Sequence, residues 1–305
     1  MSADTFIAVE WGTARTSARL IAPDGAIVDR VVEEVRLVDL DHTARIARLQ
    51  ILQARWPDAD ETIWLAGMIG SPLGIESVPQ LPCPATPAEI VKHARRLFVE
   101  GLELTILPGL SCTSRFGDLD VLRGEEVAAV GLIDHVATDD ALLLSVPGMH
   151  GKWIELNRTA IDRFHTSMTV ELYRALADRS ILAPLMIAPA NDGDAFRAGL
   201  ARAADGGGLA RLLFSARTAV MAQRFDEADA ASYLWGIVIG ADVCENLVIM
   251  ADRGCFVTGS SDVAPLFCAA INHLGMNAEL IDNDRLSAVG FARLRQTISA
   301  LEQNA

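Results

Sequence analysis

The sequence predicts an α/β protein made of two lobes with the same order of elements. Hydrophobic residues make up 51% of the 305 residues, which is enough apolar material for one large core or two. Short apolar runs that end at turn residues alternate with longer segments of helical periodicity. The order βββαβαβα occurs once in residues 1–139 and again in residues 140–305, so we expect an N-terminal and a C-terminal lobe with these bounds.

The first lobe begins with a three-stranded meander. Gly12 marks the turn between its first two strands, and Pro23-Asp24-Gly25 marks the turn into the third. The expected elements are strands at 5–9, 17–22 and 26–35, a helix at 41–55, a strand at 62–66, a helix at 86–99, a strand at 103–107 and a helix at 124–135.

The second lobe repeats this order with an insertion of additional helices. Its last helix is long enough to return to the N-terminal lobe. The expected elements are strands at 141–145, 152–156 and 160–165, helices at 169–178, 194–204, 209–223 and 228–246, a strand at 255–258, a helix at 262–274, a strand at 278–281 and a helix at 284–301.

Charge and composition narrow the class of protein. The formal net charge of −14 argues against non-specific binding to nucleic acid or to an anionic membrane. We find no apolar stretch of about 18 residues and no basic-then-apolar N-terminal segment, so we expect a cytoplasmic protein. The five cysteines lack C-x-x-C spacing, which favours buried free thiols over disulfides or a zinc site.

Two glycine-containing turns have the composition of phosphate-binding loops. Glu10-Trp11-Gly12-Thr13 follows an apolar strand, where backbone N–H groups can approach a phosphate and the carboxylate can hold Mg²⁺. The corresponding turn of the second lobe contains Gly148, His150 and Lys152. Lys152 is one of only two lysines among 26 basic residues, which favours a specific phosphate contact. Ordinary hairpin turns remain the alternative at both places.

Acidic and glycine-rich segments supply the other candidates. Asp120, Glu125 and Glu126 lie around the predicted start of the helix at 124–135, where an acid can serve as a base or simply interact with the helix dipole. Arg123 can bind an anionic substrate. The remaining candidates are the loop residues Gly67, Met68, Gly70 and Ser71, the strand-to-helix residues Gly259 and Ser260, and Thr166 beside His165. A compact loop, a helix cap and a structural histidine are the respective alternatives.

In combination, these segments resemble the 2-dehydro-3-deoxygalactonokinase family, a branch of the sugar kinase, heat-shock ATPase and actin superfamily. The resemblance covers nearly the whole chain and depends on the order of the segments. They are Glu10–Thr13, Ala66–Ser71, Ile106–Gly109, Asp120–Glu126, Pro147–Trp153, Phe164–Thr169, Asp194–Phe196, Ala216–Thr218 and Thr258–Ser260.

The resemblance implies two ribonuclease-H-like lobes flanking a cleft for ATP and substrate. It also implies transfer of a phosphoryl group from ATP, with Mg²⁺, to the terminal (C6) hydroxyl of a 2-keto-3-deoxy sugar acid such as 2-dehydro-3-deoxygalactonate, in galactonate catabolism. The implied partners are therefore small molecules, without nucleic acid or membrane, and a homodimer is compatible with the sequence.

The resemblance also implies roles for individual residues. Glu125 or Glu126 would be the catalytic base, with Asp120 as a third candidate, and Glu10 would hold the metal. ATP would contact Gly12, Thr13, Arg15, Gly148, His150, Lys152, Gly259 and Ser260. The sugar acid would contact Gly67, Met68, Gly70, Ser71, Arg123 and Thr166.

Several positions depart from the family pattern. Glu10 stands where the family has Asp, and Ala14, Arg15 and Ser17 replace a typical Ser, Asn and Arg. Two alternative functions therefore stay open. The acidic pair after Gly124 is also typical of an exopolyphosphatase-like phosphohydrolase. The departures at the first turn are compatible with a non-catalytic sensor of sugar acid or nucleotide on the kinase fold.

Overall fold

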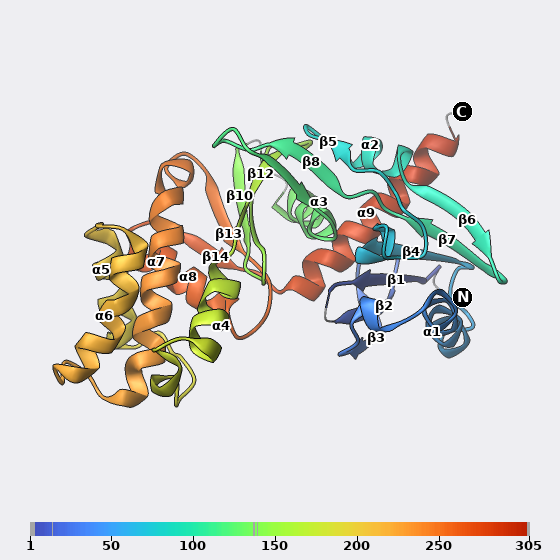
Figure 1. Cartoon of the computed structure of the whole chain (residues 1–305). Coiled ribbons are helices and arrows are strands. Elements are labelled where there is room, and N and C mark those ends of the chain that lie inside the picture. The colour runs from blue at the N-terminus through green and yellow to red at the C-terminus, as the bar shows by residue number, and fades with distance from the viewer. Residues whose placement is uncertain (1–3, 14, 137, 139, 304–305) are drawn as a thin grey trace. The chain divides into compact units, whose positions relative to one another are not determined.

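The computed structural model describes residues 4–13, 15–136, 138 and 140–303, and the chain divides into two compact units (Figure 1). Unit 1 consists of Met1–Asp139, Ile154–His165 and Asp282–Ala305. Unit 2 consists of Asp140–Trp153 and Thr166–Ile281. Each unit has its own hydrophobic core.

Unit 1 is built on a six-stranded sheet with the order β3-β2-β1-β4-β7-β6. The first three strands are antiparallel, and β4 and β7 then pair in parallel with β1 and β4. The strands are β1 (Phe6–Trp11), β2 (Thr16–Ile21), β3 (Ile27–Glu33), β4 (Thr62–Gly67), β6 (Arg95–Val99) and β7 (Leu102–Ile106). Alternate side chains of β1, among them Ile7, Val9 and Trp11, enter the core that also includes Ile46 and Leu49 of α1 (His42–Arg55).

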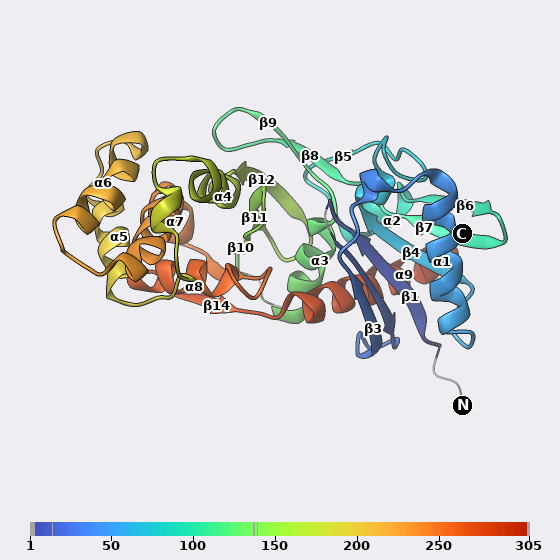
Figure 2. The ribbon, with the colours of Figure 1, turned by 60° about the horizontal axis from the view of Figure 1, so that its bottom comes forward.

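A smaller sheet and three further helices complete unit 1. The smaller sheet has the order β5-β8-β9, with β5 (Leu81–Pro82), β8 (Leu110–Thr113) and β9 (Leu119–Leu122). The helices are α2 (Pro87–Lys92), α3 (Glu125–Val136) and α9 (Asn283–Gln303). Figures 1 and 2 both show α9 alongside α3, although more than a hundred residues separate the two helices in the sequence.

The second sheet has the order β12-β11-β10-β13-β14, and β10, β13 and β14 are parallel neighbours. Its strands are β10 (Leu142–Val146), β11 (Gly151–Leu156), β12 (Ile161–Ser167), β13 (Gly254–Val257) and β14 (Ala278–Leu280). When the strands of this sheet are numbered along the chain, their spatial order is 3-2-1-4-5. The first five strands of the sheet in unit 1, β3-β2-β1-β4-β7, have the same spatial order. The predicted α/β class with two ribonuclease-H-like lobes is confirmed.

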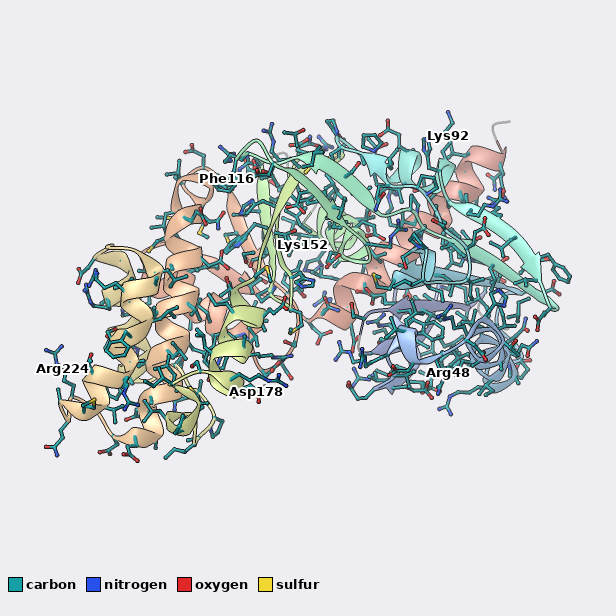
Figure 3. The ribbon with its side chains drawn as sticks, viewed as in Figure 1. Arg48, Lys92, Phe116, Lys152, Asp178 and Arg224 are labelled. Atoms are coloured by element: carbon teal, nitrogen blue, oxygen red, sulfur yellow. The ribbon has the colours of Figure 1, made fainter. Side chains whose placement is uncertain are left out.

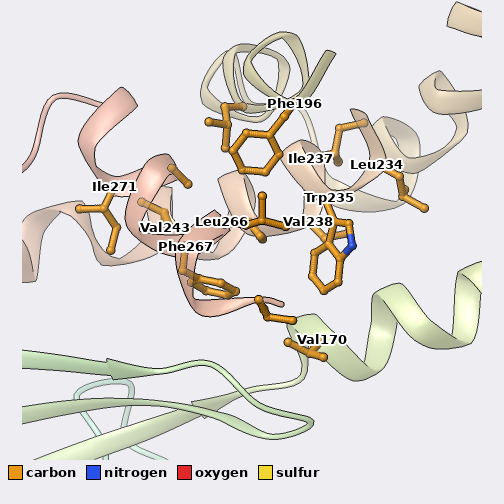
Figure 4. Close-up of a cluster of buried hydrophobic side chains, with 14 of the residues drawn as sticks. Val170, Phe196, Leu234, Trp235, Ile237, Val238, Val243, Leu266, Phe267 and Ile271 are labelled. Atoms are coloured by element: carbon orange, nitrogen blue, oxygen red, sulfur yellow. The ribbon is translucent and has the colours of Figure 1, made fainter. Parts of the chain in front are cut away.

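The helices of unit 2 pack around α7 (Ala230–Met250), whose side chains are buried along most of its length. The other helices are α4 (Thr169–Arg179), α5 (Asp194–Ala204), α6 (Leu209–Met221) and α8 (Ala264–His273). In Figure 4, Trp235 and Val238 of α7 lie in one apolar cluster with Phe196 of α5 and Phe267 of α8. The predicted insertion of helices therefore forms the core of this unit.

The prediction that the chain has no apolar stretch of membrane-spanning length was wrong, as judged by length and composition. Within the described residues, Glu227–Met250 is one helix that is long and apolar enough to cross a membrane. However, 72% of its most apolar window is buried inside the protein. Its apolar composition is explained by the contacts of α7 with neighbouring helices of unit 2.

The helix predicted at residues 86–99 was also wrong in its second half. The capping box of Thr86 and Glu89 starts α2, but the helix ends at Lys92. Residues 95–99 form β6, which pairs antiparallel with β7 across a turn at Glu100 and Gly101. Both turn residues have positive φ, 46° and 85°, which is the geometry of a two-residue hairpin loop. The turn therefore decided the structure of this segment.

The five cysteines are free, but the prediction that they are buried holds only for Cys255. The other four, Cys83, Cys112, Cys244 and Cys268, are partly exposed. Burial raises the pKa of the Cys83 and Cys255 thiols to about 12, so both are uncharged at neutral pH.

Helices α3 and α9 approach each other through two glycines, which gives a test of the packing in unit 1. A Cβ on Gly131 would lie 2.0 Å from the carbonyl oxygen of Leu286, and one on Gly290 would lie 2.0 Å from that of Val127. We expect Gly131→Ala or Gly290→Ala to destabilise the protein by about 2 kcal/mol, although alanine favours helices. Ser299→Ala on the exposed face of α9 is the control. Urea unfolding measures the difference, and equal stability of all three variants would contradict this packing.

Candidate active site

In unit 1, three segments meet where strands β1 and β4 end. Trp11 and Gly67 are register partners at the ends of these parallel strands. Gly67 has a φ of 89°, and a Cβ there would lie 2.6 Å from the carbonyl oxygen of Trp11. Gly124, with a φ of 114°, precedes α3, and its Cβ would lie 3.3 Å from Cα of Gly67. Because only glycine fits both positions, the start of α3 comes into contact with the end of β4.

Arg123 extends into the loop that follows β4. Its Nη2 donates a hydrogen bond of 2.8 Å to the carbonyl oxygen of Val78, whereas its Nη1 is buried without a partner among the described residues. A Cβ on Gly70 would lie 3.0 Å from this Nη1. Burial lowers the pKa of the Arg123 guanidinium, and the nearby Glu126 opposes this shift in part. An unsatisfied guanidinium N–H group in such surroundings is suited to bind a carboxylate.

The two glutamates at the start of α3 differ in their environment. Glu126 is fully buried, and its Oε2 accepts a hydrogen bond of 2.5 Å from the backbone N–H of Gly124. Burial, followed by the adjacent Glu125, raises the pKa of Glu126 to about 8, so its carboxyl group is mainly neutral at pH 7. Glu125 is partly exposed and accepts a hydrogen bond of 3.1 Å from the backbone N–H of Arg123.

Glu10 is held by a buried arginine. Nη1 of Arg19 lies 2.5 Å from Oε2 of Glu10, and Ser287 of α9 donates a hydrogen bond of 3.1 Å to Oε1. Nη2 of Arg19 lies 2.5 Å from Asp284, which also pairs with Arg30 of β3. Burial opposes the charge of Arg19, which is 1% exposed, but the two carboxylates raise the pKa of its guanidinium. The carboxylate of Glu10 is therefore fixed in place on both oxygens.

The turn after Glu10 is exposed. The backbone N–H of Gly12 donates a hydrogen bond of 2.8 Å to the carbonyl oxygen of Arg15, which closes the β1–β2 hairpin. Thr13 and Arg15 are exposed at this turn, so their polar groups are available to a ligand. Ala14, one of the departures from the family pattern, lies outside the described residues.

Two other sequence-predicted groups of unit 1 have structural contacts of their own. Ser71 donates a hydrogen bond of 2.7 Å from its hydroxyl to the carbonyl oxygen of Met68, so it stabilises the loop that contains Gly70. Asp120 lies in β9 opposite Cys112 rather than at the start of α3. The structure therefore places Asp120 on the β8–β9 hairpin, separate from the glutamate pair in secondary structure.

In unit 2, the candidate phosphate residues lie on the turn between β10 and β11. Lys152, labelled in Figure 3, is 6% exposed, and its Nζ donates a hydrogen bond of 3.2 Å to the carbonyl oxygen of His150. Nε2 of His150 lies 2.8 Å from Oε2 of Glu171 in the first turn of α4. Gly148 has no atoms within 4 Å of the position of a Cβ, so space is open beside its backbone.

The loop after β13 lies against the same turn. A Cβ on Gly259 would lie 2.9 Å from the carbonyl oxygen of Pro147. The carbonyl oxygen of Ser260 accepts hydrogen bonds from the backbone N–H groups of Val263 and Ala264 at 3.3 and 3.0 Å, so Ser260 precedes the start of α8. Thr166 lies in β12 and belongs to unit 2, whereas the other predicted substrate-binding residues belong to unit 1.

The polar residues that bind and orient these candidate side chains were not predicted from the sequence. Arg19, Asp284 and Ser287 surround Glu10, and Asp242 of α7 accepts a hydrogen bond of 2.9 Å from the indole N–H of Trp153, next to Lys152. Two signals were available. Arg19 is a charged residue within an apolar strand pattern, and Asp242 is the first charged residue in the apolar helix pattern that begins at Ala230.

No group of three or more His, Cys, Asp or Glu side chains forms a metal-binding cluster within the described ranges. Mg²⁺ in phosphoryl-transfer enzymes usually keeps several waters and binds through one or two carboxylates plus the phosphates of the nucleotide. Glu10 fits this pattern, since each of its fixed oxygens retains a lone pair for a metal-bound water.

A cavity of about 460 Å³ in unit 1, between α9 and strands β4, β6 and β7, contains none of the predicted site residues. Both arginines that line it are paired with carboxylates. Arg96 lies 2.6 Å from Glu302, and Arg295 lies 2.8 Å from Asp60. The paired charges make this cavity a poor site for an anionic sugar acid.

Comparison with known proteins decides the family. The model of the 2-keto-3-deoxy-galactonokinase family matches residues 10–294. The chain belongs to the 2-keto-3-deoxy-galactonokinase family. The resemblance identified from the sequence is thereby confirmed.

Individual members of the family are similar over their full length. The 2-dehydro-3-deoxygalactonokinase of Escherichia coli is 27% identical over 296 residues, which cover 96% of this chain and 98% of the relative. A relative from Rhizobium meliloti, provisionally given the same name, is 29% identical, with 97% and 98% covered. A crystal structure from Sinorhizobium meliloti, also provisionally so named, has a TM-score of 0.86 and 27% identity, with 97% of this chain and 99% of that chain covered.

The buried charge network of this family member gives a test of how Glu10 is held. Arg19→Met leaves Glu10 and Asp284 without their buried cation, so we expect a loss of about 3–5 kcal/mol in the free energy of unfolding. Arg30→Met is the matched control, because Arg30 is 59% exposed and its pair with Asp284 should contribute less than about 1 kcal/mol. Urea unfolding compares the two variants. Equal losses would show that burial of Arg19 has no special role.

The raised pKa of Glu126 gives a pH-dependent test. The folded protein binds this proton more tightly than the unfolded chain, because the pKa is about 8 rather than 4.5. The resulting stabilisation is complete below pH 4.5 and is lost as the pH rises through 8. The Glu126→Gln side chain cannot ionise. The melting temperature of this variant minus that of the native protein should therefore increase as the pH rises from 5 to 8. Glu227→Gln, at an exposed position, is the control and should keep the native pH profile. Parallel profiles for Glu126→Gln would contradict the buried proton.

Proposed function

We propose that the chain transfers the γ-phosphoryl group of ATP to the terminal (C6) hydroxyl of a 2-keto-3-deoxy sugar acid such as 2-dehydro-3-deoxygalactonate. The family match over residues 10–294 carries this proposal. It is supported by the two ribonuclease-H-like sheets and by the groups of polar residues at the strand ends of each unit. Phosphoryl transfer depends mainly on positioning and charge neutralisation, which these residues can supply.

Arg123 is proposed as the anchor of the sugar acid. Its Nη1 is buried without a partner, so the substrate carboxylate would supply the missing acceptor. Gly70 lies directly against this nitrogen, since a Cβ there would come within 3.0 Å of it. The loop of Gly67, Met68, Gly70 and Ser71 would then surround the acid end of the substrate.

Glu125 is the proposed base that accepts the proton of the substrate hydroxyl. It is partly exposed at the start of α3, where the helix N-terminus favours a carboxylate. Glu126 is less suited to this role, because its buried carboxyl group has a pKa of about 8 and bonds to Gly124. Asp120, on the β8–β9 hairpin, is the least suited of the three acids.

A phosphate-binding turn is proposed in each unit. Gly12, Thr13 and Arg15 contribute the exposed turn of unit 1, and Gly148, His150 and Lys152 contribute that of unit 2. The backbone at Gly259 and Ser260 would lie under the adenosine. Mg²⁺ bound to ATP would neutralise phosphate charge, and Glu10 would orient one of its waters.

The alternative functions have less support. The acidic pair that suggested a phosphohydrolase includes a buried carboxyl group that is mainly neutral at pH 7. The sensor hypothesis rested on Glu10, Ala14 and Ser17, yet Glu10 is held by Arg19 and Ser287 rather than displaced. We further propose a cytoplasmic enzyme that acts on small molecules, with neither nucleic acid nor membrane as partner. A homodimer is compatible with this proposal.

The activity is tested by ADP release from the purified protein with ATP and Mg²⁺. The panel contains 2-keto-3-deoxy sugar acids, ordinary aldonates and a well without acceptor. We expect ADP only with a 2-keto-3-deoxy acid. Phosphate release without acceptor would support the phosphohydrolase, and ligand-induced stabilisation without ADP would support the sensor.

The role of Arg123 is tested by Arg123→Met. Loss of charge-assisted hydrogen bonds to the substrate should raise KM for the sugar acid by about 10-fold to 100-fold and leave KM for ATP unchanged. Arg96→Met is the control, because Arg96 is 54% exposed and pairs with Glu302. An unchanged KM for the sugar acid in Arg123→Met would exclude Arg123 as its anchor.

A further inference from the structure

We propose that Asp242 is a positioning residue for ATP, because it fixes β11, into which the Gly148–Lys152 turn leads, and α4, which pairs with that turn. The inference rests on the proposed function of that turn. Asp242 lies in α7 and is 6% exposed, and both of its carboxylate oxygens accept hydrogen bonds from neighbouring side chains. Its effect must pass through the groups that donate hydrogen bonds to it.

Three of these donors come from the elements around the turn. Oδ1 of Asp242 accepts a hydrogen bond of 2.9 Å from the indole N–H of Trp153 in β11. Oδ2 accepts hydrogen bonds of 2.7 Å from the hydroxyl of Ser167, at the end of β12, and 2.6 Å from that of Thr169, at the start of α4. A single carboxylate thus joins two strands and a helix to α7.

The environment of Asp242 indicates that these bonds have a specific role. Residues 230–250 are otherwise almost entirely apolar, and a buried carboxylate is costly unless several donors satisfy it. Asn246, one turn later on α7, adds a hydrogen bond of 2.9 Å to the backbone carbonyl oxygen of Asp242. An apolar residue would pack in this helix without that cost. The acid therefore serves to fix the direction of its donors.

Two of these donors, Trp153 and Ser167, are next to a residue of the turn. Trp153 follows Lys152 directly, and the two side chains point to opposite faces of β11. The ammonium group of Lys152 donates a hydrogen bond to the carbonyl oxygen of His150, within the turn itself, so the position of Nζ follows the backbone around the turn. On the other side, the hydroxyl of Ser167 lies 3.5 Å from where a Cβ of Gly151 would be.

Helix α4 provides the second connection. Thr169 fixes its start to Asp242, and Glu171 in its first turn pairs with His150 of the turn at 2.8 Å. Loss of the Asp242 carboxylate would therefore release both β11 and the first turn of α4. The sugar acid contacts proposed in unit 1 do not include any of these residues.

The experiment compares Trp153→Phe, which removes the indole N–H, with Trp235→Phe as matched control. Trp235 is also a buried indole of unit 2, and it stacks on Tyr173 with ring centroids 3.8 Å apart. We expect Trp153→Phe to raise KM for ATP by about 10-fold, with KM for the sugar acid unchanged. Asp242→Asn should have a larger effect in the same direction.

Two further variants keep the proposal falsifiable where Asp242→Asn fails to fold. Thr169→Val should raise KM for ATP. Thr169→Ser keeps the hydroxyl and should therefore have the native KM for ATP. Equal KM for ATP in Trp153→Phe and the native enzyme, or an equal rise in Trp235→Phe, would overturn the proposal.

Calorimetric binding of a non-hydrolysable ATP analogue separates this inference from the proposed function. If the native protein binds the analogue but phosphorylates no sugar acid, the proposed function fails while the positioning role is still measured by Kd. If Kd for the analogue rises about 10-fold in Trp153→Phe but not in Trp235→Phe, the result supports the positioning role of Asp242. Equal Kd values in both variants would overturn it.

Discussion

The buried guanidinium of Arg19 is the constraint on which unit 1 depends. It lies on β2 between the carboxylates of Glu10, from β1, and Asp284, from α9, and Arg30 of β3 extends the same network. The charge of Arg19 is tolerable in its buried place only while the two carboxylates are present. The position of a candidate metal-binding carboxylate, the meander and the last helix are thus determined together.

The same unit shows how two adjacent acids of one sequence acquire different chemistry. Gly67 and Gly124 allow α3 to begin in contact with β4, and this contact buries Glu126 while Glu125 stays partly exposed. Burial makes the carboxyl group of Glu126 a mainly neutral acceptor for the backbone, whereas Glu125 is the proposed base. The neighbouring guanidinium of Arg123 lies in the same surroundings with one nitrogen unsatisfied. The environment of these three side chains therefore depends on the close backbone contact between Gly67 and Gly124.

Much of the fold was predictable from the sequence, because turn residues and periodicity agree along most of it. The failure at residues 95–99 was local, since the turn at Glu100 and Gly101 outweighs the helical pattern that starts at Thr86. Glycine-rich strand ends identified the segments that carry the candidate site. Partners distant in sequence were not predictable, because neither spacing nor periodicity relates Arg19 to Asp284 or Trp153 to Asp242. Nor does sequence alone distinguish Glu125 from Glu126, whose difference arises from burial.

The assembly of unit 1 from three separate stretches of chain has a consequence for synthesis. Residues 1–139 leave the ribosome long before α9, yet Arg19 and Gly131 have their partners in α9. A nascent chain that ends within unit 2 therefore exposes the face of α3 that α9 later covers and lacks the carboxylate of Asp284. Every residue of unit 2 precedes α9 in the chain. The lobe encoded first is thus the lobe completed last, and the face of α3 stays uncovered until α9 has been made.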